Sequence, residues 1–415
     1  MKTAVLIGAG PRGRQAYLDK LVKYGVQIIG VADLNEDNVR FVKEKYGVAD
    51  DMCFSNYTEM LKKGRIADIA LICTNDRDHV DPFKLCAEAG YHILLEKPIS
   101  SFPSEVAEVD KISDSLDKTL MICHVLRYTP FFTKLKEIID SGKIGKIMSI
   151  NHNENMAWWF ATNNFVRGKW NNSDTTSPLI LAKCCHDMDI LVYLTGKKCL
   201  RLSSFGNLGF FKPENAPEGA GTRCTVDCRI ADTCPYNVVK FNVNPPRTIA
   251  KFRANEYIED EESLRQDMKT SPWGRCVFAC DNNVADHQVI AMEFEDNITA
   301  VFTVSAFTYE HNRTIKIMGT MGEVGGDMEA GEIELKIFGE DNTEKIIVDN
   351  DILQHAGGDE GLVKAFVESV EGNTERNITS AKESLHSHMM AFAAEESRRN
   401  GGIVVDLKEF TNRYK

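Results

Sequence analysis

Three glycines near the start of the chain have the spacing of a phosphate-binding turn. Gly8, Gly10 and Gly13 follow a short apolar, β-prone run. In such a turn the first glycine allows the sharp bend, the second lets backbone N–H groups approach a pyrophosphate, and the third lets the next helix pack close to the strand. The helix start, with Pro11 and Arg12, directs partial positive charge toward the phosphates. The spacing therefore predicts a dinucleotide site.

A carboxylate follows where the ribose of that dinucleotide should lie. A second apolar run, Val26 to Ala32, ends on Asp33, twenty positions after Gly13. A carboxylate at this place accepts hydrogen bonds from both ribose hydroxyls of NAD and repels the 2′-phosphate of NADP. We therefore predict NAD. NADP is the alternative, in which Arg12 or Arg40 would meet the extra phosphate.

Lys97 stands just past another predicted strand, His92 to Leu95, in the sequence Glu96-Lys97-Pro98. The carboxyl ends of parallel strands form the edge where a nucleotide lies, so we expect Lys97 beside the cofactor. Oxidation of a secondary alcohol needs a hydride acceptor, a base for the hydroxyl proton and a positive group for the developing alkoxide. Lys97 is predicted to polarise the alcohol oxygen or, with a lowered pKa, to take the proton. Glu96 is predicted to fix the loop through a charge pair, or to form a plain salt bridge.

His186 is the second candidate for proton transfer. It lies near the start of an apolar helix predicted over Ile180 to Leu194. Asp189, three residues later, shares its helical face and is predicted to orient its ring, whereas Asp187 points elsewhere. Lys183, one turn earlier, is predicted to reach the same pocket.

The first part of the chain alternates strands and helices, which predicts a doubly wound α/β sheet. One buried run ends at Asn75, where a loop is expected at the nucleotide edge. The predicted strands are 3–7, 26–32, 53–54, 68–74, 92–95 and 119–124, and the predicted helices are 36–46, 57–62, 79–89 and 103–116.

From about Lys146 the pattern changes to alternating strands separated by turn signals, which predicts an open, mostly antiparallel sheet. We predict an NAD-binding domain over 1–125 and an α+β substrate-binding and oligomerisation domain over 126–415, with the final helix packing back on the first domain. The predicted strands are 147–152, 200–207, 287–294, 299–306, 313–318, 332–338 and 345–348, and the predicted helices are 180–194, 361–371 and 381–399.

Composition narrows the class of protein further. The 415 residues are 43% hydrophobic and 27% charged, as in an ordinary globular protein long enough for two domains. The net charge of −12 argues against nucleic acid or an anionic membrane as a partner. The only early apolar run is too short for an export signal, and no run is long enough to span a bilayer. We therefore expect a cytoplasmic protein whose twelve cysteines are reduced thiols.

Taken together, these motifs resemble the Gfo/Idh/MocA oxidoreductases, the relatives of glucose–fructose oxidoreductase and inositol dehydrogenase. The resemblance extends over essentially the whole chain and rests on the glycine turn, Thr74-Asn75 with His79, Glu96-Lys97-Pro98, Arg127-Tyr128-Thr129-Pro130, Ser141 to Lys146, and His186-x-x-Asp189. It implies a Rossmann domain followed by an α+β domain whose open sheet often builds a dimer or tetramer interface. It also implies that Thr74, Asn75, His79, Glu96 and Lys97 contact NAD.

The resemblance further implies a sugar, glycoside or cyclitol as substrate, and a role for His186 in binding the reacting ring and relaying a proton. One position departs from the pattern, because most dehydrogenases of this family carry an aspartate where this chain has Ala182. The usual Asp–His relay is therefore missing. Lys183 is predicted to bind a sugar hydroxyl, with a structural role as the alternative.

Further residues are predicted to line the substrate pocket. Arg127 and Tyr128 follow the sixth strand and are placed at the junction of the domains. Trp158 and Trp159 lie in a polar loop that runs to Trp170. An indole ring suits stacking on the C–H face of a sugar, and ordinary loop packing is the alternative.

The cysteines suggest a weak metal motif. Cys224, Cys228 and Cys234 have the spacing C-x3-C-x5-C, which could supply three thiolates to a structural zinc ion. The usual short paired spacing is absent, so free thiols that pack as small hydrophobic groups are the preferred interpretation. A fourth ligand would come from Cys276, Cys280 or Cys185.

Three functions are consistent with this pattern. The first is an NAD-dependent dehydrogenase that acts on a CH–OH group of a sugar or glycoside, with C3 as a possible position, or that reduces the keto-sugar. The second is a glycoside hydrolase that oxidises C3 transiently, eliminates the aglycone and recycles its NAD. The third is an NAD-dependent sensor, which Lys97 and His186 argue against. We predict the first.

Overall fold

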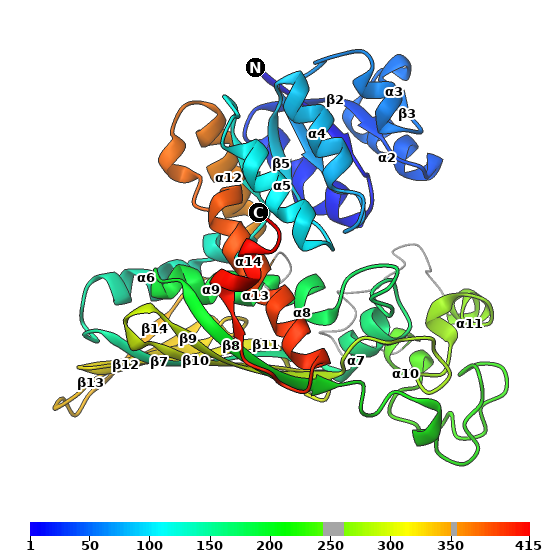
Figure 1. Ribbon diagram of the computed structural model, residues 1–415. Coiled ribbons are helices and arrows are strands. Elements are labelled where there is room, and N and C mark those ends of the chain that lie inside the picture. The colour runs from blue at the N-terminus through cyan, green and yellow to red at the C-terminus, as the bar shows by residue number, and fades with distance from the viewer. Residues whose placement is uncertain (244–260, 350–354) are drawn as a thin grey trace.

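Apolar runs in the first third of the chain form a parallel six-stranded sheet in the computed structural model, which describes residues 1–243, 261–349 and 355–415. Helices lie on both faces of this sheet (Figure 1), so its central strands bury almost every side chain. The strands are β1 (Lys2–Ile7), β2 (Val26–Ala32), β3 (Cys53–Phe54), β4 (Ile69–Ile72), β5 (His92–Leu95) and β6 (Leu120–Ile122).

The strand order β3-β2-β1-β4-β5-β6 reverses direction between β1 and β4. Ligands of open α/β sheets bind outside the carboxyl ends of the strands at this reversal. The doubly wound Rossmann sheet expected from the sequence is confirmed. The helices that cover it are α1 (Asp19–Lys23), which continues a π-helical turn at Arg12–Leu18, α2 (Glu36–Tyr46), α3 (Tyr57–Leu61), α4 (Val80–Ala89) and α5 (Pro103–Ser113).

The second sheet has nine strands in the order β14-β13-β12-β11-β7-β10-β9-β8-β15. Strands β7 and β10 pair in parallel, and the other neighbours pair antiparallel, which confirms the open, mostly antiparallel sheet. The strands are β7 (Ile147–Met156), β8 (Cys199–Asn207), β9 (His287–Phe294), β10 (Thr299–Ser305), β11 (His311–Gly319), β12 (Gly322–Asp327), β13 (Glu332–Ile337), β14 (Thr343–Ile347) and β15 (Val405–Asp406).

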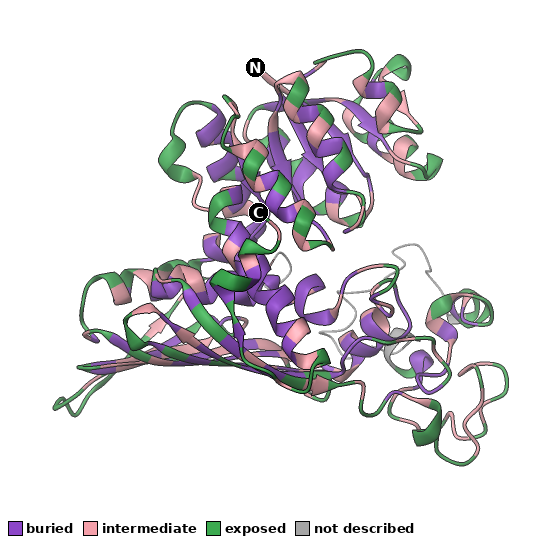
Figure 2. Cartoon of the chain, in the orientation of Figure 1, coloured by how far each residue is buried: buried purple, intermediate pink, exposed green. Residues whose placement is uncertain are grey.

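The described helices cover one face of this second sheet (Figure 1). Helices α6 (Pro130–Asp140), α9 (Cys185–Thr195) and α13 (Ala381–Arg399) lie between it and the Rossmann sheet (Figure 1). Side chains along β9 and β10 accordingly alternate, with Ile290 and Phe302 fully buried and Val289 and Val301 38% and 41% exposed (Figure 2).

The last helices join the two sheets. Helix α12 (Gly358–Val370) packs on α1 and on the 3-10 turn Val125–Tyr128. Helix α13 contacts α5 and β6 of the Rossmann sheet as well as α9 and β8 of the second sheet. The backbone of Gly401 and Gly402 has positive φ where the chain turns away after α13. Helix α14 (Leu407–Asn412) follows β15 at the end of the chain.

Several elements differ from the sequence expectation. The helix predicted over 180–194 is broken, because α8 (Leu179–Ala182) ends before Lys183 and α9 begins at Cys185. Strand β12 was not predicted, since its three glycines weaken any strand signal. Among its described residues, the segment between β8 and β9 holds the short helices α10 (Val238–Val243) and α11 (Glu261–Asp267), and α7 (Trp158–Ala161) lies beside it (Figure 1).

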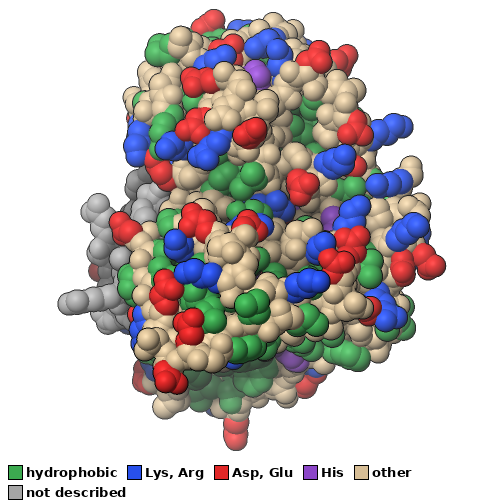
Figure 3. Space-filling view, turned by 90° about the vertical axis from the view of Figure 1, so that its left-hand side faces the viewer, with side chains coloured by type: hydrophobic (Ala, Val, Ile, Leu, Met, Phe, Trp, Pro, Cys, Tyr) green, Lys and Arg blue, Asp and Glu red, His purple; other side chains and the backbone are tan. Residues whose placement is uncertain are grey.

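No helix within the described ranges has the length and apolar character needed to cross a bilayer. Lysine, arginine and carboxylate side chains intermingle on the face shown in Figure 3, whose lower part, over the second sheet, carries most of its hydrophobic side chains.

Candidate active site

The glycine turn after β1 is closely packed at two of its three glycines. A Cβ on Gly8, whose φ is +86°, would lie 2.6 Å from the Cys73 backbone. A Cβ on Gly13 would lie 2.6 Å from the Gly8 carbonyl oxygen. A Cβ on Gly10 would meet no atom within 4 Å, so the turn is open at the glycine expected to face the pyrophosphate.

Asp33 follows β2, and its side chain is hydrogen-bonded to this turn. Its carboxylate accepts hydrogen bonds from the Ala9 backbone N–H at 2.6 Å and from the Asn35 backbone N–H at 2.8 Å. The side-chain amide of Asn38 donates a third bond at 3.1 Å. These bonds hold the carboxylate at the carboxyl edge of the sheet, where a ribose is expected.

The predicted cofactor residues after β4 form a compact loop at the same edge. The Thr74 hydroxyl donates to the Asp78 carbonyl at 2.8 Å, and Asn75 is exposed. The buried ring of His79 binds the Pro98 carbonyl at 2.7 Å and the Thr74 carbonyl at 3.2 Å. Both ring nitrogens of His79 are therefore used to tie two strand-end loops together.

Arg12, which is partly exposed, and the buried Glu96 form a charge pair between the glycine turn and the end of β5. Arg12 Nε lies 2.7 Å from Glu96 Oε1, and Arg12 also binds Asp359 of α12 at 2.6 Å. Burial raises the pKa of Glu96, but the positive charges of Arg12 and Lys97 outweigh that effect and lower it. Burial lowers the pKa of Arg12, and the charges of Asp359, Tyr17 and Glu96 outweigh this and raise it. Pro11 is exposed beside this pair.

Lys97 reaches across from the Rossmann sheet to the second domain. Its Nζ donates a hydrogen bond to the Ala182 carbonyl oxygen at 2.8 Å. This carbonyl is the last of α8, so the break between α8 and α9 leaves it outside the hydrogen-bond ladder of α9 and open to a side-chain donor. The peptide bond between Lys97 and Pro98 is cis.

His186 lies in the first turn of α9 and is 2% exposed. Its ring centroid lies 5.7 Å from that of His124 and 6.1 Å from that of His355. Among the residues that the structure describes, neither ring nitrogen of His186 has a hydrogen-bond partner. Burial lowers the pKa of His186, and Lys97 is the leading charge that lowers it further. The imidazole is therefore neutral near pH 7 and able to accept a proton.

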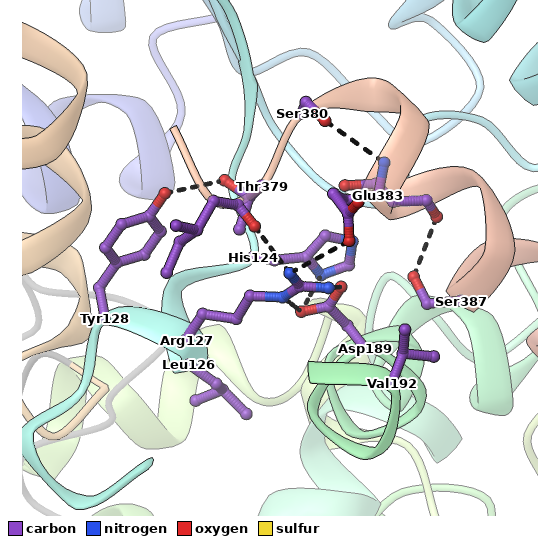
Figure 4. A network of polar contacts seen from close by, with 12 residues as sticks. His124, Leu126, Arg127, Tyr128, Asp189, Val192, Thr379, Ser380, Glu383 and Ser387 are labelled. Carbon is purple, nitrogen blue, oxygen red and sulfur yellow. Dashed lines mark hydrogen bonds and ion pairs between the residues drawn. The ribbon is translucent and has the colours of Figure 1, made fainter. Parts of the chain in front are cut away.

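Asp189 does not orient His186, contrary to expectation. Its two carboxylate oxygens accept hydrogen bonds from Arg127 Nε and Arg127 NH2, each at 2.7 Å (Figure 4). Both side chains are at least 97% buried, so a guanidinium at this distance takes the carboxylate in preference to a neutral ring. Asp187 points elsewhere, as expected, and binds His152 at 2.8 Å.

Arg127 and Tyr128 thus belong to a network at the junction of the two sheets rather than to an open pocket wall. The remaining Arg127 nitrogen donates to the Ile378 carbonyl at 2.7 Å. The Tyr128 hydroxyl lies 3.2 Å from the Thr379 hydroxyl (Figure 4). Both acceptors lie in the chain that leads into α13.

Lys183 belongs to a second cluster of charged side chains, which also includes Glu154 and Arg313. Its Nζ lies 3.3 Å from Glu154 Oε1 and 4.9 Å from the centre of the Phe160 ring. Glu154 also pairs with Arg313 at 2.6 Å, and Arg313 pairs with Asp187 at 2.9 Å. Because the helix breaks at Lys183, this side chain does not share a helical face with His186.

The tryptophans of the loop after β7 differ in their surroundings. Trp158 is half-buried and its ring meets Tyr236 edge to face, with centroids 6.2 Å apart. Trp159 is buried in a small core with α10 and α11. The Trp170 indole N–H donates to Asp76 at 3.2 Å, which links this loop to the end of β4.

Sequence reasoning missed two histidines of this site. His124 follows β6, and the strand-end rule that selected Lys97 would also have selected it. His355 lies 3.2 Å from Asp359, which holds Arg12, and it reaches the site only because α12 packs on α1. No local pattern near His355 indicates that contact.

The geometry agrees with the comparisons to known proteins. A family model described as "Oxidoreductase family, NAD-binding Rossmann fold" matches residues 2–125, and its companion, "Oxidoreductase family, C-terminal alpha/beta domain", matches residues 136–218. The chain belongs to the Gfo/Idh/MocA oxidoreductases. It is an NAD-binding oxidoreductase.

Relatives of this oxidoreductase include two curated proteins. The oxidoreductase YteT of Bacillus subtilis is 23% identical over 78% of this chain and 76% of its own length. Myo-inositol 2-dehydrogenase of Thermotoga maritima is 30% identical, over 29% of this chain and 35% of its own length. The second match thus spans about a third of that dehydrogenase.

Solved structures share the whole fold. Apo scyllo-inositol dehydrogenase from Lactobacillus casei has a TM-score of 0.67 at 16% identity and covers 98% of both chains. An oxidoreductase from Agrobacterium radiobacter, solved with NAD+, L-tartaric acid and magnesium, has a TM-score of 0.69 at 14% identity and covers 98% of this chain and 99% of its own.

Proposed function

We propose that this oxidoreductase oxidises a secondary hydroxyl on the ring of a sugar, glycoside or cyclitol with NAD as hydride acceptor, or reduces the corresponding ketone. The observation that carries the proposal is that Lys97 is held next to the start of the helix that carries His186, although the two residues lie far apart in the sequence. Lys97 is tethered to Ala182, four residues before His186. The Lys97 charge also acts on the His186 ring and lowers its pKa.

Each of these side chains supplies one requirement of alcohol oxidation. An ammonium group has three N–H donors. One N–H of Lys97 donates to the Ala182 carbonyl, so two remain for the substrate oxygen. The positive charge stabilises the alkoxide that forms as the hydroxyl proton leaves. The neutral His186 ring accepts that proton, and the buried His124 ring lies next to it.

The residues of the glycine turn fit a bound NAD. Gly8 and Gly13 leave no room for a Cβ, Gly10 is open, and Asp33 is held at the strand end that a ribose would face. When bound, NAD supplies the acceptor for the hydride of the ring carbon. Thr74, Asn75 and Glu96 lie at the same strand edge and are proposed to position its nicotinamide half.

The substrate class rests on the relatives and on the aromatic loop. Myo-inositol 2-dehydrogenase is a relative, scyllo-inositol dehydrogenase shares the fold, and a further dehydrogenase structure of this fold holds NADH with UDP-GlcNAcA. The half-buried Trp158 is proposed to stack on the ring, and Lys183 with Glu154 to bind a hydroxyl. On a pyranose, C3 is the position to examine first.

The hydrolytic alternative gains no support from the comparisons, because the relatives described above carry the names of dehydrogenases and oxidoreductases. We therefore keep it only as an outcome of the test below.

Assembly through the open face of the second sheet is a further part of the proposal. Phe205 of β8 pairs with Val289 of β9, and Ala291 of β9 pairs with Val301 of β10. Phe205, Val289 and Val301 are 58%, 38% and 41% exposed. An exposed apolar strip of this kind suits a dimer or tetramer of identical chains.

The test is to incubate the chain with NAD and a panel of cyclitols, free sugars and aryl glycosides. Nicotinamide absorbance and product mass are followed together. We expect NADH in equal amount to an uncleaved ring product that has lost two hydrogens. Release of aglycone without net NADH would instead establish the hydrolase.

A further inference from the structure

Four cysteines outside the proposed active site line one small cavity. Cys224, Cys228 and Cys234 come from the segment after β8, and Cys276 comes from just before β9. The other lining groups include Arg167 and Tyr236, and the rest are mainly apolar (Ala220, Ile230, Ala231, Val277 and Phe278). The C-x3-C-x5-C motif and one of its three candidate partners thus meet in space.

The backbone holds these cysteines in place through short turns. Arg223 and Arg275 form an isolated antiparallel bridge, in which Cys224 N–H donates to the Gly274 carbonyl at 3.1 Å and Cys276 N–H donates to the Thr222 carbonyl at 2.8 Å. Cys224 and Cys276 are therefore diagonal neighbours on one face of the pair, at Cα separations of about 7–8 Å.

Turns of the backbone place Cys228 and Cys234 at the same cavity. The Asp227 carboxylate accepts the backbone N–H groups of Thr222 and Arg223, each at 2.9 Å, which folds the chain back just before Cys228. Cys234 N–H donates to the Ile230 carbonyl at 2.9 Å and closes a further turn.

The size of the cavity selects among possible occupants. The cavity has a volume of about 10 Å³ for a water-sized occupant. This volume is close to what a single water molecule needs. One ion fits such a space, and an iron–sulfur cluster does not. Four thiolates around one ion is the arrangement that structural zinc sites use.

The surroundings suit the charge of such a centre. Four thiolates and one divalent cation carry a net charge of −2, which needs a nearby positive group in an apolar shell. Arg167 is 1% exposed, and its NH2 lies 3.9 Å from Cys224 Sγ and 2.6 Å from the Tyr236 carbonyl oxygen.

We propose that Cys224, Cys228, Cys234 and Cys276 bind one zinc ion that fastens the two ends of the segment between β8 and β9 to each other. Within residues 1–243, 261–349 and 355–415, no three metal-ligating side chains lie so that they could hold a metal ion as they stand. The proposal therefore requires the thiols to turn inward on binding, by rotation about their Cα–Cβ bonds.

The proposed ion would also support the loop that carries the tryptophans. The Arg167 guanidinium joins that loop to the Arg275 carbonyl at 2.7 Å and to the Tyr236 carbonyl. Tyr236 in turn contacts Trp158. The segment has little regular structure among its described residues and a small core, a situation in which a metal ion commonly supplies stability.

The first experiment measures zinc in the purified full-length chain by elemental mass spectrometry. The reduced, chelator-treated chain is then titrated with Co2+. We expect about one zinc per chain and, with Co2+, the intense thiolate-to-cobalt absorption of a four-sulfur site, which Zn2+ abolishes. A chain without zinc that also gives no such absorption overturns the proposal.

Variants test which thiols are the ligands. Cys224→Ser and Cys276→Ser are each expected to lose the ion and the cobalt absorption. Cys280→Ser is the matched control, because the Cys280 thiol donates to the Cys276 carbonyl at 3.2 Å and does not line the cavity. Cobalt absorption unchanged in Cys224→Ser and Cys276→Ser would overturn the assignment, as would its loss in Cys280→Ser with retention in Cys276→Ser.

NAD binding by each variant shows whether the Rossmann domain has folded. If a cysteine variant does not fold, the cobalt spectrum of the wild-type chain decides, because a four-sulfur and a three-sulfur site differ in absorption. A count of free thiols in the unfolded, metal-free chain adds an independent check. Fewer than twelve free thiols would indicate disulfides and contradict a thiolate site.

Discussion

The Lys97 ammonium donates a hydrogen bond to the Ala182 carbonyl oxygen at 2.8 Å, across the junction of the two domains. The acceptor is available because the chain breaks its helix between α8 and α9. The break thus fixes the position of the proposed catalytic ammonium next to the helix that carries His186.

Replacing Lys97 tests its role in the chemistry. We expect Lys97→Met to lower kcat by about 100-fold to 10,000-fold, because the alkoxide loses its positive partner. NAD binding, measured by calorimetry, should persist, since Asp33 and the glycine turn are untouched. Lys97→Arg keeps the charge and serves as the control. Turnover that survives in Lys97→Met would remove this residue from the mechanism.

Replacing Asp33 tests the choice of dinucleotide. The carboxylate is held at the predicted ribose position by the Ala9 and Asn35 backbone N–H groups. We expect Asp33→Ser to shift the ratio of NAD to NADP affinity toward NADP by about tenfold or more, or about 1.4 kcal/mol. An unchanged ratio would mean that Asp33 does not face the ribose.

The pH dependence of the reaction tests His186 as base. Burial lowers the pKa of His186 well below 6.5, and the neutral ring is the active form. Activity should therefore be retained at pH 6.5 and should fall only at lower pH, as the ring becomes protonated. The measurement is kcat/KM against pH, with His186→Gln as the comparison. An acid limb at or above pH 7 in the wild-type chain would point to a different base.

The free energy of unfolding should also decrease at low pH, because the buried His388 must stay neutral in the folded chain. The His388 ring accepts the Ile99 backbone N–H at 3.0 Å and must stay neutral, and burial lowers its pKa from 6.5 to about 3. Between these values the unfolded chain binds a proton that the folded chain does not. The free energy of unfolding should therefore drop by about 1.4 kcal/mol per pH unit for this residue as pH falls below 6.5.

Urea unfolding at several pH values between 4 and 7 measures that slope. His388→Gln should lower the slope by the contribution of one histidine. An identical slope in both proteins would contradict the assignment.

The pair of Arg127 and Asp189 should be important for stability. Both side chains are buried, so removing one leaves the other charge without compensation. We expect Asp189→Leu and Arg127→Met each to lower the free energy of unfolding by about 3–5 kcal/mol, and the double variant to lose less than the sum. Denaturant unfolding gives all three values. Additive losses would show that the two side chains are not coupled.

The open sheet face should control assembly. Val301 is 41% exposed on that face. We expect Val301→Glu to reduce the mass of the particle measured by light scattering, with Thr343→Glu, on the exposed edge strand β14, as the charge-matched control. A wild-type chain that is already monomeric would contradict the proposed interface.

Local patterns predicted most of the fold. The observed bounds of strands such as β2 and β5 and of helices such as α2 and α13 agree with the predicted ranges. These elements could be predicted because the periodic pattern of apolar residues is visible in the local sequence. Strand β12 was missed because its glycines carry no such pattern. The break at Lys183 was missed because the residues on both sides are apolar, and the Lys97 side chain that binds the freed Ala182 carbonyl comes from a distant part of the chain.

Local sequence likewise predicted some residues of the candidate site but not the contacts between distant segments. Gly8, Asp33 and Lys97 follow strands and were found from their place in the chain. The partner of Asp189 was predicted wrongly, because Arg127 lies 62 residues away and spacing on a helix gives no information about such a contact. The meeting of the four cysteines likewise depends on a backbone bridge between distant segments.

One measurement tests the central proposal most directly. A substrate found in the panel is prepared with deuterium on the ring carbon that bears the reacting hydroxyl, and is incubated with the chain and NAD. We predict that one deuterium per turnover appears in the nicotinamide ring of NADH and that the ring product stays uncleaved. NADH without deuterium, or a cleaved product with no net NADH, would contradict the proposed oxidation.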